Sequence, residues 1–167
     1  MDTSSFLDLD IVVVCGLPGA GKSHFSRAYF KDTDFKRVNR KIIRKALYEM
    51  TNFDEQWKNE YFNEKDEYLV KHVERKIIEH YLHKSRKVLI DNTSVTKDSR
   101  KNYVRIAREM NKSIGVIFIN TSVNTCIERN RKSQDKIPEI VISNLYAKIE
   151  IPQKDEGFKR VKKIDNY

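Results

Sequence analysis

The segment of this sequence that most constrains its fold is a glycine-rich loop between a β-branched strand and a helical pattern. The strand covers residues 11–14, and the loop after it reads Gly16-Leu17-Pro18-Gly19-Ala20-Gly21-Lys22-Ser23. This G-x-x-x-x-G-K-[ST] spacing, in its strand–loop–helix context, predicts a phosphate-binding loop. Its glycines let backbone N–H groups face phosphate oxygens at the positive end of the next helix. We therefore expect a nucleoside triphosphate to bind here. The alternative is a turn that only links strand and helix, and the complete spacing and flanks argue against it.

Two side chains are candidates for holding Mg²⁺ beside this nucleotide. Ser23 ends the loop, and its hydroxyl is expected to ligate the metal while Lys22 reaches the β- and γ-phosphates. Residues 87–91 form a continuous apolar strand that ends in Asp91, which is typical of a buried parallel strand with a carboxylate at its carboxyl end. Asp91 is therefore the expected Walker-B-like acid opposite Ser23. The alternative for Asp91 is a helix cap or a turn residue.

Strand patterns alternate with helical patterns along the whole chain. Apolar or alternating segments at residues 35–39, 87–91 and 114–120 are separated by amphipathic stretches, and residues 158–164 alternate like an edge strand with lysines outward. This order predicts an α/β P-loop NTPase fold, with a parallel sheet of about five strands flanked by helices and a small helical lid. The length of 167 residues matches a single domain over residues 1–167.

The longest helical pattern extends from about residue 55 to residue 84, in one or two pieces. Its apolar stripe lies at i, i+4 spacing, with flanking positions that widen it. The stripe residues are Leu69, Val73, Ile77 and Tyr81, widened by Val70, Ile78 and Leu82. Aromatic residues interleaved with lysines in the first half, Trp57, Tyr61, Phe62 and Tyr68, could stack on unpaired bases. Their helical spacing instead favours a place in the core.

Basic residues follow two of the predicted strands. The strand at residues 35–39 leads to Asn39, Arg40 and Lys41 at the carboxyl edge of the sheet, where ligands bind in open α/β folds. Arg40 and Arg44 are one helical turn apart, so both could point at one anion. A polar segment at about residues 129–137, which contains Arg129 and Arg131, could form a lid over ATP and stabilise charge on the transferring phosphoryl group. A solvated charge run is the alternative.

Composition limits the setting in which such a domain works. A net charge of +9 favours polyanionic partners, although a lysine-rich host composition would produce the same excess. The two cysteines form no C-x-x-C pair, which disfavours a disulfide or zinc framework and indicates an intracellular protein, cytoplasmic or nuclear. The first ten residues lack the basic start of a signal peptide, and no apolar run is long enough to span a membrane. We expect no membrane partner, and the oligomeric state stays open.

Five segments together are similar to the kinase domain of the polynucleotide 5′-hydroxyl kinase family. They are the loop at residues 16–23, Val38-Asn39-Arg40, Ile90-Asp91-Asn92-Thr93, Glu128-Arg129-Asn130-Arg131 with Ile137-Pro138, and Glu150-Ile151-Pro152 with Asp155-Glu156-Gly157-Phe158. The resemblance covers nearly the whole chain. It implies transfer of the γ-phosphate of ATP to the 5′-hydroxyl end of DNA or RNA, with ATP and Mg²⁺ as cofactors, in nucleic-acid repair.

The resemblance also implies roles for individual residues. Lys22 and Ser23 match the loop pair, Arg44 matches an arginine that engages the scissile phosphate, Asp91 matches the acid, Arg129 matches a lid arginine, and Arg131 could be a second one. One position departs from the family pattern, which places an aspartate general base directly after Asn-Arg. This chain has Lys41 there, and a lysine near its usual pKa of about 10.4 is already protonated and cannot accept a proton.

Three functions are therefore consistent with the sequence. The first is a polynucleotide 5′-hydroxyl kinase slowed by Lys41, because phosphoryl transfer depends mostly on positioning and electrostatics. The second is a pseudokinase that binds ATP and a nucleic-acid end without transferring phosphate. The third is a kinase for a nucleoside or another small molecule on the same fold.

Overall fold

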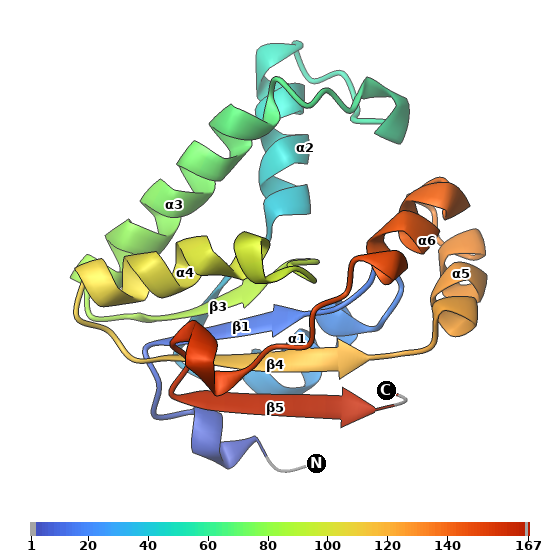
Figure 1. The fold of residues 1–167 in the computed structure, drawn as a ribbon. Coiled ribbons are helices and arrows are strands. Elements are labelled where there is room, and N and C mark those ends of the chain that lie inside the picture. The colour runs from blue at the N-terminus through green and yellow to red at the C-terminus, as the bar shows by residue number, and fades with distance from the viewer. Residues whose placement is uncertain (1–2, 166) are drawn as a thin grey trace.

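Five parallel strands form one sheet, in the order β2-β3-β1-β4-β5 (Figure 1). In the computed structural model, which describes residues 3–165 and 167, the strands are β1 (Ile11–Cys15), β2 (Phe35–Val38), β3 (Lys87–Asp91), β4 (Ile114–Asn120) and β5 (Arg160–Asp165). The helices are α1 (Lys22–Phe30), α2 (Arg40–Thr51), α3 (Glu67–His83), α4 (Lys97–Glu109), α5 (Val123–Arg131) and α6 (Glu139–Ala147). Short 3₁₀ turns lie at Ser4–Phe6, Asn59–Tyr61 and Lys154–Glu156. The predicted α/β P-loop fold is confirmed.

β1 lies at the centre of the sheet, and every residue in it is buried. Burial on both faces explains its continuous β-branched sequence. Ile11, Val13 and Cys15 belong to one hydrophobic cluster, which α3 and α4 cover, whereas Val12 and Val14 belong to another, which α1, α5 and α6 cover. The alternating side-chain directions of a strand thus place helices on both faces of the sheet.

The register of the central strands decides where the glycine-rich loop lies. Val14 of β1 is aligned with Asp91 of β3, so both strands end at the same edge of the sheet. The backbone N–H of Gly16 donates to the Thr93 carbonyl at 2.9 Å, and that of Asn92 donates to the Val14 carbonyl at 3.2 Å. These bonds hold the start of the loop against the end of β3. The predicted edge strand is also confirmed, since β5 pairs with β4 alone.

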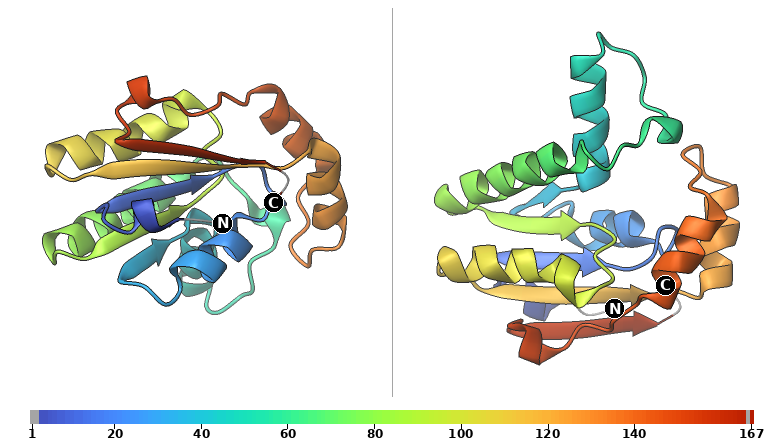
Figure 2. Two further views of the ribbon diagram at one scale, coloured as in Figure 1. Left: turned by 90° about the horizontal axis from the view of Figure 1, so that it is seen from below. Right: turned by 45° about the horizontal axis from the view of Figure 1, so that its top comes forward.

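The predicted helix over residues 55–84 is wrong in its first half. α3 begins at Glu67, and residues 52–66 form a loop that contains one 3₁₀ turn. The chain leaves the helical conformation at Phe53 and Asp54, which have positive φ angles of 52° and 67°. Side chains with a Cβ adopt this region at a cost, so the break marks a turn that α2 cannot continue through. Figure 2 shows this loop at the far end of α2, clear of the sheet.

The predicted apolar stripe of α3 is confirmed except at Leu69, which is 49% exposed. Glu74 is buried with the other stripe and flanking residues, which are buried or pack against the core: Val70, Val73, Ile77, Ile78, Tyr81 and Leu82. The helix is turned so that Glu74, a polar residue, lies inward. Periodicity read from apolar residues alone could not place Glu74 there, because a buried carboxylate depends on partners elsewhere in the chain.

The aromatic residues before and at the start of α3 do not all join the core. Phe62 is 49% and Tyr68 is 80% exposed, so the expected core position is wrong for both. Trp57 and Tyr61 are half-buried and pack with Tyr48 of α2, whose ring is stacked on that of Tyr61 at 5.1 Å between centroids. The loop therefore packs on the outer part of α2 and not on the sheet.

Candidate active site

The glycine-rich loop has the backbone of an anion-binding loop. Gly19 has a φ of 81°, and a Cβ there would collide with the Cys126 carbonyl of α5. Gly21 has a φ of 97° and caps α1, so the first N–H groups of that helix are left for an anion. Leu17 and Ala20 are buried and fix the loop against the core. The predicted phosphate site thus has a packing reason for its glycines as well as a chemical one.

Lys22 lies folded back over its own loop. Its Nζ donates to the Leu17 carbonyl at 2.7 Å. Desolvation lowers the pKa of Lys22, while the nearby Asp91 carboxylate opposes that shift and the charge of Lys41 adds to it. A desolvated ammonium group with one carbonyl partner is suited to receive a phosphate oxygen.

Ser23 and Asp91 meet as the sequence predicts. The Ser23 hydroxyl donates to Asp91 Oδ2 at 2.9 Å, and Asp91 is fully buried at the end of β3. The other carboxylate oxygen, Oδ1, is buried and has no hydrogen-bond partner. An unsatisfied carboxylate oxygen beside a hydroxyl fits a hard cation such as Mg²⁺. The residues that the structure describes contain no cluster of three or more metal-ligating side chains, so phosphate and water oxygens would complete the shell.

Arg37 is a residue of this site that sequence reasoning missed. It lies on β2, and its Nε and Nη2 donate to Asp91 Oδ2 at 2.8 and 2.5 Å. Its Nη2 also donates to the Ser23 hydroxyl at 3.1 Å. The only signal in the sequence is a charged residue in a short strand, which is typical of an exposed strand face. The pairing of β2 with β3 turns that residue toward Asp91.

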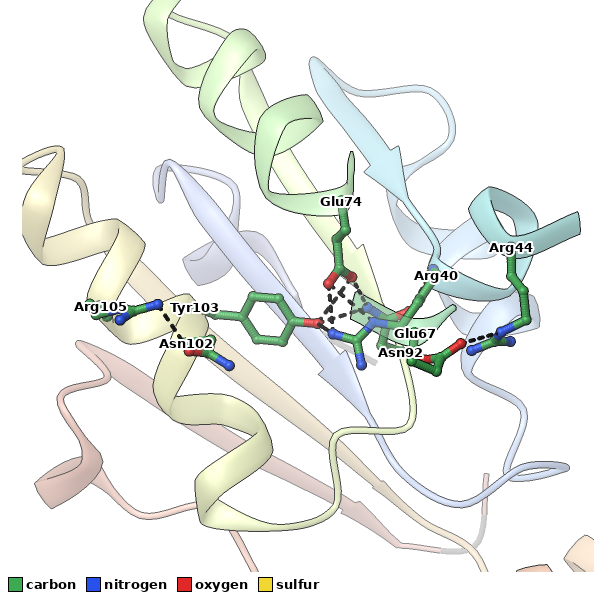
Figure 3. A network of polar contacts seen from close by, with 8 residues as sticks. All are labelled: Arg40, Arg44, Glu67, Glu74, Asn92, Asn102, Tyr103 and Arg105. Carbon is green, nitrogen blue, oxygen red and sulfur yellow. Dashed lines mark hydrogen bonds and ion pairs between the residues drawn. The ribbon is translucent and has the colours of Figure 1, made fainter. Parts of the chain in front are cut away.

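Arg40 and Arg44 do not point at one anion, contrary to expectation. Arg40 donates to Glu74 at 2.6 Å and to the Tyr103 hydroxyl at 2.9 Å, and Asn92 donates to the same two side chains at 2.5 and 2.9 Å (Figure 3). This buried network joins the start of α2 to α3, α4 and the end of β3. Burial raises the pKa of Tyr103 well above its ordinary value, so its hydroxyl keeps its proton. Arg40 therefore has a structural role.

Arg44 is held by a separate carboxylate. Its Nε donates to Glu67 Oε1 at 2.5 Å, and its guanidinium lies 5.3 Å from the centre of the Phe62 ring. In Figure 3 a dashed line joins Arg44 to Glu67, and none joins this pair to the network around Arg40. The arginine that the resemblance assigns to the scissile phosphate is thus at the start of α2 but paired with α3.

Lys41 contacts the lid. Its Nζ lies 3.0 Å from Asp135, and Lys45 Nζ donates to both oxygens of the same carboxylate at 2.9 and 3.0 Å. Hydrogen bonds from Lys45 and Lys41 lower the pKa of Asp135. Nearby, Asn59 donates to the Lys136 carbonyl at 2.7 Å. The segment between α5 and α6 therefore connects to α2 and to the loop after it.

The two lid arginines have different partners. Arg129 Nη1 donates to the Tyr167 carbonyl at 3.0 Å and to the Gly19 carbonyl at 3.4 Å, so it lies against the phosphate-binding loop. Arg131 pairs with Glu139 of α6 at 2.6 and 3.0 Å, and its side chain is 64% exposed. α5 and α6 lie beyond the carboxyl ends of the strands in both views of the fold (Figures 1 and 2). The structure brings Arg129 to the site and places Arg131 on the lid surface.

The parallel sheet and the glycine-rich loop between β1 and α1 define this protein as a domain with the P-loop NTPase fold. More particularly, the chain belongs to the AAA domain family, whose model matches residues 11–152. No helix in the described residues is long and apolar enough to cross a bilayer.

The chain is similar to two curated kinases. It is 28% identical over 145 residues to the L-seryl-tRNA(Sec) kinase of Methanococcus maripaludis, covering 85% of this chain and 53% of the relative. It is 26% identical over 160 residues to the bifunctional polynucleotide phosphatase/kinase of Schizosaccharomyces pombe, covering 93% of this chain and 33% of the relative. The chain thus spans about half or less of the length of these relatives.

A solved structure shares the fold. A chain of the Pnkp1/Rnl/Hen1 RNA repair complex superposes with a TM-score of 0.67 at 21% identity, over 83% of this chain and 43% of that chain.

Proposed function

We propose that this protein transfers the γ-phosphate of ATP to a 5′-hydroxyl end of DNA or RNA, with Mg²⁺. The observation that carries the phosphotransferase part is the meeting of Ser23 with the buried, partly unsatisfied Asp91 at the end of the phosphate-binding loop. The polynucleotide acceptor rests on the likeness to the polynucleotide phosphatase/kinase over nearly the whole chain. The net charge of +9 is consistent with a polyanionic acceptor.

Each charged or metal-binding residue of the site would have its own role in phosphate transfer. Mg²⁺ bound by Ser23 and Asp91 would neutralise charge on the β- and γ-phosphates. Lys22 would exchange the Leu17 carbonyl for a phosphate oxygen, which is a stronger, charge-assisted partner. Arg129 lies at the Gly19 carbonyl and would reach the transferring phosphoryl group from the lid. Arg44 would leave Glu67 for an anionic group when the acceptor binds.

The residue at the position of the family's general base, Lys41, is consistent with slow phosphate transfer. Lys41 carries a positive charge there, but it pairs with Asp135 at 3.0 Å. A carboxylate from the lid therefore lies next to position 41 and could accept the proton of the attacking hydroxyl in place of the missing aspartate. The two lysines on Asp135 lower its pKa, which makes it a weaker base.

The test is phosphate transfer from γ-labelled ATP to a panel of acceptors. The panel contains 5′-hydroxyl DNA and RNA strands, their 5′-phosphorylated counterparts, free nucleosides and a seryl-tRNA. The proposal expects label on the 5′-hydroxyl strands alone, and none with Lys22→Ala. Label on nucleosides at the same rate would favour a small-molecule kinase. ATP and strand binding without any transfer would favour a pseudokinase.

A seryl-tRNA acceptor is the second candidate, because the L-seryl-tRNA(Sec) kinase is also similar to this chain, at 28% identity over 85% of it. Both acceptors combine a primary hydroxyl with a polynucleotide. Transfer to seryl-tRNA in preference to 5′-hydroxyl strands would replace the first proposal.

A further inference from the structure

We propose that Arg37 acts as a resident cation in the metal site, and that it competes with the divalent ion for Ser23 and Asp91 until nucleotide binds. The inference rests on the proposed function only in placing a divalent ion at these two residues. It does not depend on the acceptor. Arg37 is a positioning residue in this account, because it acts through the metal ligands.

The geometry places Arg37 on the oxygens that the metal would use. Its guanidinium donates twice to Asp91 Oδ2 and once to the Ser23 hydroxyl, at 2.8, 2.5 and 3.1 Å. The same hydroxyl donates to Asp91 Oδ2 at 2.9 Å. A cation therefore already bridges the predicted metal ligands, and Asp91 Oδ1 is the oxygen left without a partner.

The surroundings explain why this arginine is held there. The Asp91 side chain is 0% exposed, whereas that of Arg37 is 33% exposed, so the guanidinium lies between the buried carboxylate and solvent. A buried carboxylate without a counter-charge is costly. Arginine stays charged at every accessible pH and offers several donors in one plane. Arg37 can therefore compensate Asp91 while no metal is bound.

The same contacts oppose metal entry. A divalent ion that binds Ser23 and Asp91 must displace or tolerate a positive charge within hydrogen-bond distance of its ligands, and like charges that close repel strongly. Phosphate oxygens would provide a second set of acceptors for the freed guanidinium. Nucleotide and metal would then each raise the affinity for the other, because both favour the displacement of Arg37 from Ser23 and Asp91.

The test compares Arg37→Gln with wild type and with Lys36→Gln, which removes a lysine from the neighbouring exposed position of β2. Binding of Mn²⁺, used as the probe for the divalent site, is measured by electron paramagnetic resonance without nucleotide and with ADP. We expect Arg37→Gln without nucleotide to bind Mn²⁺ at least about tenfold more tightly than wild type, because a competing charge is gone. Lys36→Gln should match wild type, and ADP should raise the affinity of wild type more than that of Arg37→Gln.

Thermal unfolding gives a second readout. Arg37→Gln should unfold at a lower temperature than wild type without divalent ions and recover with Mn²⁺, whereas Arg37→Lys, which keeps a charge, should stay closer to wild type. If Arg37→Gln binds Mn²⁺ no more tightly than wild type while both bind it with ADP, the competition is wrong. If neither protein binds Mn²⁺ even with ADP, the proposed metal site itself fails, and the inference with it.

Discussion

Lys22 is partly withdrawn from water, and its Nζ donates to the Leu17 carbonyl of its own loop. Because desolvation lowers the pKa of Lys22, the folded protein holds this proton less tightly than the unfolded chain does. The charge therefore costs folding free energy at every pH below the lowered pKa. We expect Lys22→Met to raise the Tm of the nucleotide-free protein at neutral pH, because the substitution removes a charge whose desolvation opposes folding.

The same substitution should abolish productive ATP binding, which calorimetry measures. The increase in Tm of Lys22→Met over wild type should become smaller as the pH rises from the lowered pKa of Lys22 toward the ordinary value of 10.5, because Lys22 of the folded wild type then loses its proton. Lys31→Met, at an exposed position just after α1, is the matched control and should change neither quantity. Unchanged ATP affinity in Lys22→Met would contradict the phosphate-binding role.

Glu74 belongs to the buried network and not to the reacting groups. It accepts hydrogen bonds from Arg40, Asn92 and Tyr103. Removing one partner of a buried ion pair leaves an uncompensated charge, so we expect Glu74→Ala to lower the free energy of unfolding by about 3–5 kcal/mol. Urea denaturation measures this. Glu79→Ala on the same helix breaks a more exposed pair with Arg75 and should cost about 1 kcal/mol or less.

Among the elements, the lid and α2 are coupled through Asp135. Lys41, Lys45 and Asp135 are each 30–41% exposed, so these pairs contribute little to overall stability. They should instead bias the position of the lid. We expect Asp135→Asn to increase backbone hydrogen exchange in residues 132–137 with little change in Tm. Arg131→Gln, which breaks a lid pair on the outer surface, is the control, and equal exchange in Asp135→Asn and wild type would show that the contact does not restrain the lid.

The effect of having lysine at position 41, where the resemblance places an aspartate general base, can be tested by substitution. We expect Lys41→Asp to raise 5′-kinase turnover by at least about tenfold, because general-base catalysis contributes about 10²–10⁴-fold when the geometry is right. The single change would place two carboxylates side by side. The exchanged pair Lys41→Asp with Asp135→Lys keeps opposite charges across the contact, so it tests the new carboxylate without that repulsion.

The opposite account makes Lys41 a working residue, either as a clamp on an acceptor phosphate or as the group that orients Asp135. Steady-state rates on one 5′-hydroxyl oligonucleotide distinguish the two accounts. Loss of activity in both Lys41→Asp and Lys41→Ala would show that Lys41 is required. The lysine at the position of the family's aspartate would then not be the cause of slow turnover.

At the scale of the whole molecule, the net charge of +9 favours binding to a polyanion. If several lysines and arginines contact phosphates, oligonucleotide affinity should fall with salt on a log–log slope of several units. Fluorescence anisotropy over a salt series measures the slope, with an uncharged nucleoside as competitor, which should compete poorly. Salt-independent binding together with effective competition would point to a small-molecule acceptor.

Local sequence patterns were sufficient to predict the glycine-rich loop, the buried strands and the Ser23–Asp91 pair. The spacing of residues 16–23 predicts the phosphate-binding loop because glycine backbone freedom and a lysine-serine pair are local properties. Buried parallel strands show as continuous apolar runs, so β1, β3 and β4 could be identified without the structure, and the end of β3 marked Asp91. The meeting of Ser23 with Asp91 then followed from the rule that parallel strands end at one edge.

Tertiary structure alone decided the partners of the charged side chains. Arg37 reaches Asp91, 54 residues away, Arg40 reaches Glu74, 34 residues away, and Lys45 reaches Asp135, 90 residues away. Periodicity reports which face of an element is apolar, but it does not report which distant charge will lie opposite. A buried carboxylate such as Glu74 is stable only with its partners in place, so the rotation of α3 that buries it became visible only once strands, helices and lid were assembled.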